Sequence, residues 1–374
     1  MRHLLSAAHV IVGAADAGPG WLIVEDGVIR RLETGTPGDV DLRDATVTAF
    51  DTVAAGFVDT HVHGALGIDF GDPGVDPGPA IAHHRRAGVA AVLASIATSA
   101  PRDLLTRIAE LRPLVARGEL AGLHLEGPWL SPLRRGAHAP HLLRAPTADE
   151  IDRVLTTAEG TVRMVTIAPE LPGALDAVAR LVDAGVVVAL GHSDADADTA
   201  RRAMDAGASV VTHVFNGMPP LSAREPGLVG AALSRPEVTV ELIADGIHVS
   251  DTVIDVVIAA AGQRMSLVSD AMSATGLGDG EYVLAGNAVA VRDGVARTVD
   301  GTSLAGGTMT LGGIVARLIG RGIPPLTVVT AAACTPARAL GIEAPRLRVG
   351  GRADLVGVSD RSVRTMAGGS WLAS

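Results

Sequence analysis

The sequence predicts a (β/α)8 barrel of the TIM type, joined to a small β-sandwich domain that both termini form. Between residues 53 and 345, eight short and nearly continuous apolar segments alternate with helical segments, as expected for parallel strands buried on both faces. At the two ends, residues 1–52 and 346–374 carry short strand-like segments separated by turn signals. The length of 374 residues accommodates a barrel of about 250 residues and a smaller domain.

The individual elements are predicted from hydrophobic periodicity and turn signals. Strands of the terminal domain are expected at residues 9–12, 21–24, 28–32, 45–49, 353–358 and 361–366. Barrel strands are expected at residues 56–61, 90–95, 121–125, 162–167, 186–190, 209–213, 238–243 and 266–268. Helices are expected at residues 101–117, 148–159, 172–184, 196–206 and 251–261, and an inserted hairpin at residues 281–300.

Composition excludes several functional classes. The formal net charge is -10 and no basic stripe with interleaved aromatic residues is present, so no nucleic-acid partner is expected. The longest uncharged run, residues 206–223, contains a histidine, an asparagine and two prolines, so no membrane span is expected. The N-terminus lacks the apolar region of a signal peptide. The single cysteine, Cys334, cannot form an internal disulfide, and a cytoplasmic location is expected.

Side chains that can bind metals follow five of the eight predicted barrel strands. They are His61 and His63 after the first strand, Glu126 after the third, His192 after the fifth, His213 after the sixth and Asp270 after the eighth. The carboxyl ends of barrel strands meet at the catalytic face, so these side chains should lie together. Imidazole and carboxylate ligands suit Zn, Fe, Ni or Co better than Mg or Ca. We therefore expect one or two divalent metal ions per chain.

Further polar residues are candidates for substrate contacts. His138 and His248 lie in loops after the third and seventh strands. Asn216 is one of only two asparagines in the chain. Arg224 suits bidentate phosphate recognition, although a surface ion pair is an alternative. His124 precedes Glu126 by two residues on the same side of its strand, where it either supports the site or packs in the core.

Six stretches across the predicted barrel form a pattern known from one enzyme family. They are GFVDTHVHG (56–64), HLEGPWLSPLRRGAHAP (124–140), GHSDA (191–195), THVFNGMPPLSAREPGLVG (212–230), ADGIHVS (244–250) and LVSDAMSATG (267–276). The HxH motif resembles the amidohydrolase superfamily as a whole. HLEGP followed by GAH, and HVFNGM followed by REPG, resemble the N-acetylglucosamine-6-phosphate deacetylases more narrowly. That family usually has alanine where Gly217 stands here.

The resemblance implies a metal-dependent hydrolase of amino-sugar metabolism that converts N-acetylglucosamine 6-phosphate to glucosamine 6-phosphate and acetate. It implies that His61, His63 and Glu126 bind one metal ion, and that Glu126, His192 and His213 bind another, with Glu126 bridging. Asp270 would act as general base and acid, which amide hydrolysis needs because an unprotonated amine is a poor leaving group.

For the substrate, the resemblance implies that His138 polarises the acetyl carbonyl. Asn216, the backbone of Gly217, Arg224 and His248 would hold the phosphorylated sugar. The family forms homodimers, so one of these residues could come from the partner subunit.

Other functions remain open at this point. The substrate could be another N-acetylhexosamine phosphate, because the epimers differ by one hydroxyl. A dihydroorotase-type hydrolase often bridges its metals with a carboxylated lysine, but this chain has no lysine, so Glu126 is the available bridge. A deaminase would have no evident need for Arg224. A non-catalytic binding scaffold would have lost ligands, whereas every expected metal-site position is kept here.

Overall fold

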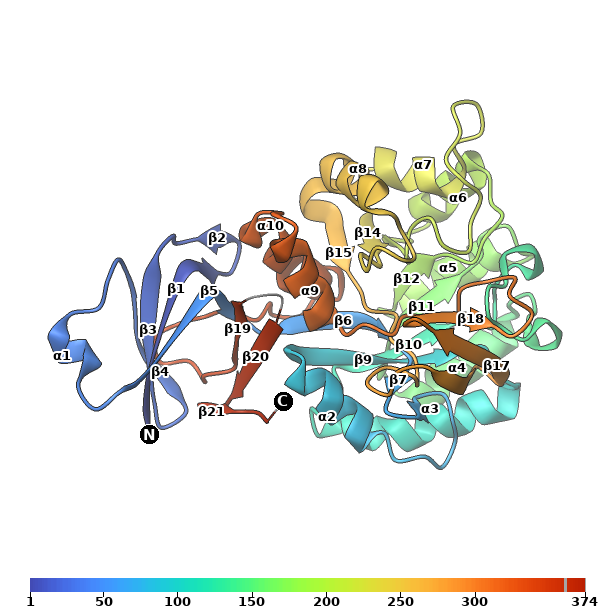
Figure 1. Ribbon diagram of the computed structural model, residues 1–374. Coiled ribbons are helices and arrows are strands. Elements are labelled where there is room, and N and C mark those ends of the chain that lie inside the picture. Colours follow the sequence, from blue (N-terminus) through green and yellow to red (C-terminus); the bar gives the residue numbers. More distant parts are fainter. Residues whose placement is uncertain (360–361, 374) are drawn as a thin grey trace. The chain divides into compact units, whose positions relative to one another are not determined.

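The computed structural model describes residues 1–359 and 362–373 (Figure 1). The chain forms two compact units. The first comprises residues 1–59, 82–91 and 310–374, and the second comprises residues 60–81 and 92–309. Both ends of the sequence thus belong to the first unit.

The first unit contains a mixed sheet built from both termini. Its strands run in the order β21-β20-β19-β5-β1-β3-β4, and β2 pairs with β1. The strands are β1 (Arg2–Val12), β2 (Ala15–Asp16), β3 (Gly20–Glu25), β4 (Val28–Thr34), β5 (Thr46–Ala55), β19 (Leu355–Ser359), β20 (Ser362–Ala367) and β21 (Ser370–Trp371). β1 and β5 are parallel, whereas the other pairs are antiparallel.

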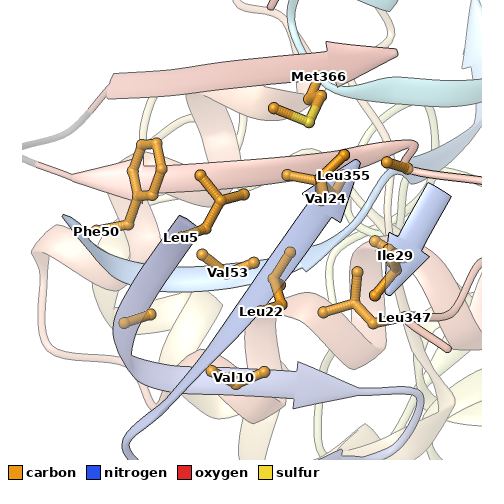
Figure 2. Packing of buried hydrophobic residues seen from close by; sticks show 13 residues of the cluster. Leu5, Val10, Leu22, Val24, Ile29, Phe50, Val53, Leu347, Leu355 and Met366 are labelled. Carbon is orange, nitrogen blue, oxygen red and sulfur yellow. The ribbon is translucent and has the colours of Figure 1, made fainter. Parts of the chain in front are cut away.

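The sheet curls around one hydrophobic core. Figure 2 shows side chains of this cluster, among them Leu5, Val53 and Met366, packed against one another. The curl brings β4 to the segment before β19, where Ile29 donates a backbone hydrogen bond to Gly351 (2.9 Å). The helices of this unit are α1 (Asp39–Leu42), α9 (Leu311–Gly320), α10 (Pro325–Val329), a π-helical turn (Thr330–Cys334) and α11 (Thr335–Ala339).

Eight parallel strands form the barrel, which confirms the predicted fold class (Figure 1). They are β6 (Phe57–Val62), β9 (Val89–Ala97), β10 (Gly122–Glu126), β11 (Val162–Ile167), β12 (Val187–Leu190), β13 (Val210–Val211), β14 (Thr239–Leu242) and β15 (Met265–Leu267). They are hydrogen-bonded in chain order from β6 to β15. A parallel bridge between Val62 and Ala271 closes the barrel, and the N–H of Asp270 donates to the carbonyl of His61 (2.9 Å).

Helices connect the strands and bury one face each. They are α2 (Gly78–Arg86), α3 (Pro101–Ala116), α4 (Ala148–Ala158), α5 (Ala174–Asp183), α6 (Ala197–Asp205), α7 (Gly227–Ser234) and α8 (Asp251–Ala261). Thr147 and Asp196 cap α4 and α6 by accepting backbone hydrogen bonds. Short 3-10 turns occupy Pro132–Arg134, Pro140–Leu142 and Gly262–Arg264. In the described part of the chain, no helix is both long and apolar enough to cross a membrane.

A small antiparallel insert follows the last barrel strand. It consists of β16 (Gly280–Leu284), β17 (Asn287–Arg292) and β18 (Val295–Thr298), one strand more than the predicted hairpin. A separate pair, β7 (Gly64–Ala65) and β8 (Ile68–Asp69), follows β6. Leu284 packs with Ala137 and Met272 in one buried cluster, and the Asn287 amide donates to the carbonyl of Ala137 (2.7 Å). The insert is thus fixed to the loop that carries His138.

The predicted strand bounds differ from the structure where polar residues interrupt the hydrophobic pattern. β1 begins at Arg2 rather than at residue 9, because His3 and Ser6 obscure the apolar run. The sixth barrel strand ends at Val211, before His213, because His213 has a φ of 22° and turns the chain out of the sheet. Residue 361, the first of a predicted strand, lies outside the described residues.

Candidate metal centre and active site

The six predicted ligands and acid–base residues come together at the carboxyl ends of the barrel strands. All are buried, and they are His61, His63, Glu126, His192, His213 and Asp270. Three of them hold a positive backbone φ, which is 45° in His192, 22° in His213 and 49° in Asp270. Each such residue costs about 1–3 kcal/mol and persists only where its surroundings enforce the conformation, and such strain is concentrated at functional sites.

Glu126, the last residue of β10, lies at the middle of this group. Its Oε1 atom is 3.1 Å from Nε2 of His192 and 3.1 Å from Nε2 of His213. The same oxygen is 3.3 Å from Nε2 of His61. Its Oε2 atom is 3.1 Å from Nε2 of His63. The carboxylate of Glu126 therefore lies within 3.3 Å of a ring nitrogen of all four histidines, Oε1 facing three of them and Oε2 the fourth.

The histidine nitrogens also converge on one another. Nε2 of His61 is 3.1 Å from Nε2 of His63, and Nε2 of His192 is 3.2 Å from Nε2 of His213. Oδ1 of Asp270 is 3.3 Å from Nε2 of His63. Ligand atoms of His61, His63 and Asp270 all lie within 4.8 Å of one another, close enough to hold one metal ion. The donor set, imidazole nitrogen with carboxylate oxygen, fits a divalent transition metal.

The hydrogen bond at Nδ1 decides which ring nitrogen of a histidine carries the hydrogen. It therefore decides whether Nε2 can bind a metal ion or donates a hydrogen bond. Nδ1 of His192 lies 2.8 Å from the carbonyl of Arg134 and must donate to it, which leaves the Nε2 lone pair facing the site. In His138, Nδ1 accepts a hydrogen bond from the backbone N–H of Thr98 (3.4 Å). Its hydrogen is therefore on Nε2, which lies 3.2 Å from Oε2 of Glu126. His138 presents a donor to the site.

Burial and charge shift the pKa values of these groups in opposite directions. Burial lowers the pKa of His138 to about 4, so this ring stays neutral. Burial also acts to lower the pKa of His63, but hydrogen bonds to Asp270 and Glu126 raise it to about 9. Although burial favours protonated carboxyl groups, the neighbouring His61 holds the pKa of both Asp270 and Glu126 well below the usual range.

These shifts predict that metal binding to the metal-free protein depends on pH. Because the pKa of His63 is about 9, a metal ion must displace its proton at lower pH. Affinity should therefore rise as pH rises toward 9, by up to about tenfold per pH unit for each displaced proton. Calorimetric titration with Zn²⁺ in buffers of different ionisation enthalpy should detect proton release at pH 6.5 and less at pH 9.5. Equal affinity and proton release at both pH values would contradict this assignment.

A cavity of 270 Å³ opens onto this group. Its outer wall includes Asn216, Gly217, His248, Leu284 and Ser303. A pocket with a few convergent polar groups at the carboxyl end of a barrel is the usual place for a small-molecule site.

Four of the predicted substrate residues line this cavity, namely His138, Asn216, Gly217 and His248. The amide of Asn216 donates to the carbonyl of His213 (3.2 Å), which ties its loop to a metal-site residue. Gly217 has a φ of 61°, and an added Cβ would lie 2.8 Å from Nδ1 of His192. The local backbone therefore requires glycine here. Nδ1 of His248 is 2.8 Å from Oδ2 of Asp245, and this carboxylate raises the pKa of His248 against the effect of burial.

Two other predicted residues lie elsewhere. Arg224 is in an exposed loop and does not line the cavity of its own chain. His124 is fully buried and bonds Ser95 (2.8 Å) and Thr166 (2.8 Å) rather than reaching the cavity. The ring of His124 instead meets that of His61 edge to face, with centroids 4.5 Å apart.

Comparison with known proteins identifies the family. The model of the amidohydrolase family matches residues 52–371. The chain belongs to the amidohydrolase family. An N-acetylgalactosamine-6-phosphate deacetylase of Escherichia coli O157:H7 is 36% identical to this amidohydrolase over 364 residues, which are 95% of each chain. An N-acetylglucosamine-6-phosphate deacetylase of Vibrio furnissii is 35% identical over 350 residues, 90% of this chain and 87% of the other.

A solved structure is similar over the whole chain. It is an N-acetyl-D-glucosamine-6-phosphate deacetylase mutant from Mycobacterium smegmatis in complex with N-acetyl-D-glucosamine-6-phosphate. It is 42% identical, covers 100% of both chains and superposes with a TM-score of 0.92.

Proposed function

We propose that this amidohydrolase removes the acetyl group from an N-acetylhexosamine 6-phosphate, with N-acetylglucosamine 6-phosphate as the leading substrate. Glucosamine 6-phosphate and acetate would be the products. The observation that carries the proposal is the position of Glu126 between two histidine pairs at the end of a cavity, beside Asp270. Deacetylases that act on the gluco and galacto epimers are both similar to the chain, so N-acetylgalactosamine 6-phosphate is the second candidate.

The metal centre would consist of one or two divalent ions of Zn, Fe, Ni or Co. The ligands would be His61, His63, Glu126, His192 and His213. A metal ion lowers the pKa of a coordinated water from about 15.7 toward about 7. Asp270 lies beside these ligands, with Oδ1 3.3 Å from Nε2 of His63, and its carboxylate would accept the proton of the attacking water. Asp270 would then pass this proton to the leaving amine.

His138 would position the acetyl group. It is neutral, and its Nε2–H points to the carboxylate of Glu126, next to the cavity. A donor aimed at the developing oxyanion contributes about 3 kcal/mol in comparable sites. Asn216, the backbone N–H of Gly217 and His248 line the outer wall, where they would hold the sugar phosphate.

Arg224 would reach the phosphate from the partner subunit of a homodimer. The cavity lining described in this chain contains no arginine, and Arg224 is exposed. A dianionic phosphate in a chain of net charge -10 needs a local cation, which an exposed arginine of a second copy can supply. We place this reaction in the cytoplasm, where amino-sugar phosphates are metabolised.

Amine release from sugar substrates tests the proposed activity. The 6-phosphates of N-acetylglucosamine, N-acetylgalactosamine and N-acetylmannosamine are compared, each beside its unphosphorylated form, with metal-loaded enzyme. One of the phosphates should be hydrolysed with a kcat/KM at least about tenfold above that of its free sugar, because one charge-assisted contact contributes about 1.5–3 kcal/mol. Equal rates for the phosphorylated and the free sugar would contradict the proposed recognition of the phosphate. No turnover of any sugar would favour a non-catalytic binding scaffold.

Replacing Arg224 by alanine should raise KM for the 6-phosphate about 10- to 100-fold and change the kinetics of the free sugar much less. Arg201→Ala, which removes another exposed arginine on α6, serves as the control. Equal effects on both substrates would make Arg224 a structural residue.

Mixed dimers test whether Arg224 acts on the active site of its own subunit or on that of the partner subunit. Refolding Arg224→Ala together with Asp270→Asn should restore activity if the arginine acts across the interface. One site of the mixed dimer then has both residues intact. If Arg224 acts within its own chain, the mixture should remain as inactive as its components.

A further inference from the structure

A layer of polar residues fills the barrel directly below the metal centre. Its members are Thr60, Ser95, His124, Thr166, Thr212 and Glu241, all at most 1% exposed. Interiors of such barrels are usually packed with Val, Ile and Leu. Glu241 on β14 is the most costly member, because a buried carboxylate is unfavourable unless hydrogen bonds compensate it.

Both oxygens of Glu241 accept hydrogen bonds from threonine hydroxyls. Thr60 donates to Oε1 (2.5 Å) and Thr212 donates to Oε2 (2.9 Å). Oγ1 of Thr212 also lies 3.1 Å from Nδ1 of His61. The hydroxyl of Thr212 has one hydrogen and gives it to Glu241, so its oxygen can only accept from His61.

This chain of hydrogen bonds fixes the hydrogen of His61 on Nδ1. In the neutral ring, the form that binds a metal ion, the lone pair is then on Nε2, which lies 3.1 Å from Nε2 of His63 and 3.3 Å from Oε1 of Glu126. If the hydroxyl of Thr212 lost its acceptor, it could turn and donate to Nδ1. His61 would then carry its hydrogen on Nε2, the form that cannot bind a metal.

We propose that Glu241 is a positioning residue that acts through Thr212 to hold His61 in its metal-binding tautomer and orientation. The inference rests on the proposed metal centre. Glu241 does not line the cavity and is not one of the proposed substrate-binding residues. The second polar pair of the layer consists of Ser95 and Thr166, which bond His124, a histidine that does not reach the cavity.

Two isosteric variants distinguish an effect on the orientation of His61 from a general effect on the stability of the protein. Thr212→Val and Thr60→Val each remove one hydroxyl from Glu241, so both should lower the melting temperature of the metal-free protein by a similar amount. Only Thr212→Val also removes the hydroxyl that lies 3.1 Å from Nδ1 of His61. Its affinity for Zn²⁺, measured by competition with a chromophoric chelator, should fall by about 10- to 100-fold. The affinity of Thr60→Val should stay near that of the wild type.

Further variants keep the test decisive. Thr212→Ser retains the hydroxyl and should restore wild-type affinity. Glu241→Leu should weaken binding alone and add little in the Thr212→Val background, since the same relay is already broken. If Thr212→Val does not fold, the contrast between Glu241→Leu and Thr60→Val decides the question. Equal affinity losses in Thr212→Val and Thr60→Val, or no loss in either, would overturn the proposal.

The readout is independent of the sugar substrate. A wild-type protein that binds Zn²⁺ but deacetylates no sugar phosphate would contradict the proposed function and leave the relay testable by the same affinities. A wild-type protein that binds no metal ion would overturn the metal centre and the relay together.

Discussion

Replacing Asp270 by asparagine is expected to lower kcat by about 10²- to 10⁴-fold, the usual contribution of a positioned acid–base group. Asparagine keeps the size and one oxygen of aspartate but cannot accept and return a proton. In the structure, Oδ1 of Asp270 lies 3.3 Å from Nε2 of His63, and the neighbouring histidines hold its pKa well below the usual range. The carboxylate is therefore present at neutral pH and placed beside the metal centre.

Metal content and a matched variant make this result specific. All five proposed ligands remain in Asp270→Asn, so most of the metal should stay bound, as elemental analysis of the purified variant would show. Asp196→Asn makes the same chemical change at the N-cap of α6, where asparagine also caps well, and should behave as the wild type. Turnover near the wild-type rate in Asp270→Asn would remove Asp270 from the proton transfers.

The positions of the candidate metal ligands could be predicted because the barrel imposes them. Parallel strands end at one face, so polar residues that follow buried strands must meet there, whatever their separation in sequence. This rule was sufficient to bring together Glu126 and His213, which are 87 residues apart and 3.1 Å from each other in the structure. The fold class depends on the same periodicity and is confirmed.

Properties that depend on side-chain partners could not be predicted in the same way. The donor role of His138 depends on a backbone N–H of Thr98, 40 residues earlier. The requirement for glycine at 217 depends on the ring of His192. Glu241 was missed although it carries the same signal as Glu126, an acidic residue within a buried apolar strand, because it lies inside the barrel rather than at its rim.

Replacing Glu126 by glutamine is expected to have the largest effect on the proposed metal centre, because this carboxylate lies within 3.3 Å of all four proposed histidine ligands. Its Oε1 atom faces His192 and His213 at 3.1 Å, and its Oε2 atom faces His63 at 3.1 Å. We expect the wild type to bind two metal ions at full loading, about 3.5–4 Å apart. The glutamine variant should bind neither ion firmly, and its deacetylase activity should fall to background.

Single histidine variants test whether the shared carboxylate really joins two ions. His63→Gln should lose only the ion next to β6, and His192→Gln should lose only the ion next to β12, so each should retain one equivalent. Glu126→Gln should lose both, because an amide has one neutral oxygen where the carboxylate offers two charged ones. Titrating Co²⁺ into chelator-treated protein gives the stoichiometry from the absorption spectrum, with activity followed in parallel. Saturation of the wild type at one equivalent, with full activity retained in His63→Gln, would show that the histidine pair of β6 is not a working metal site and that Glu126 serves a single ion.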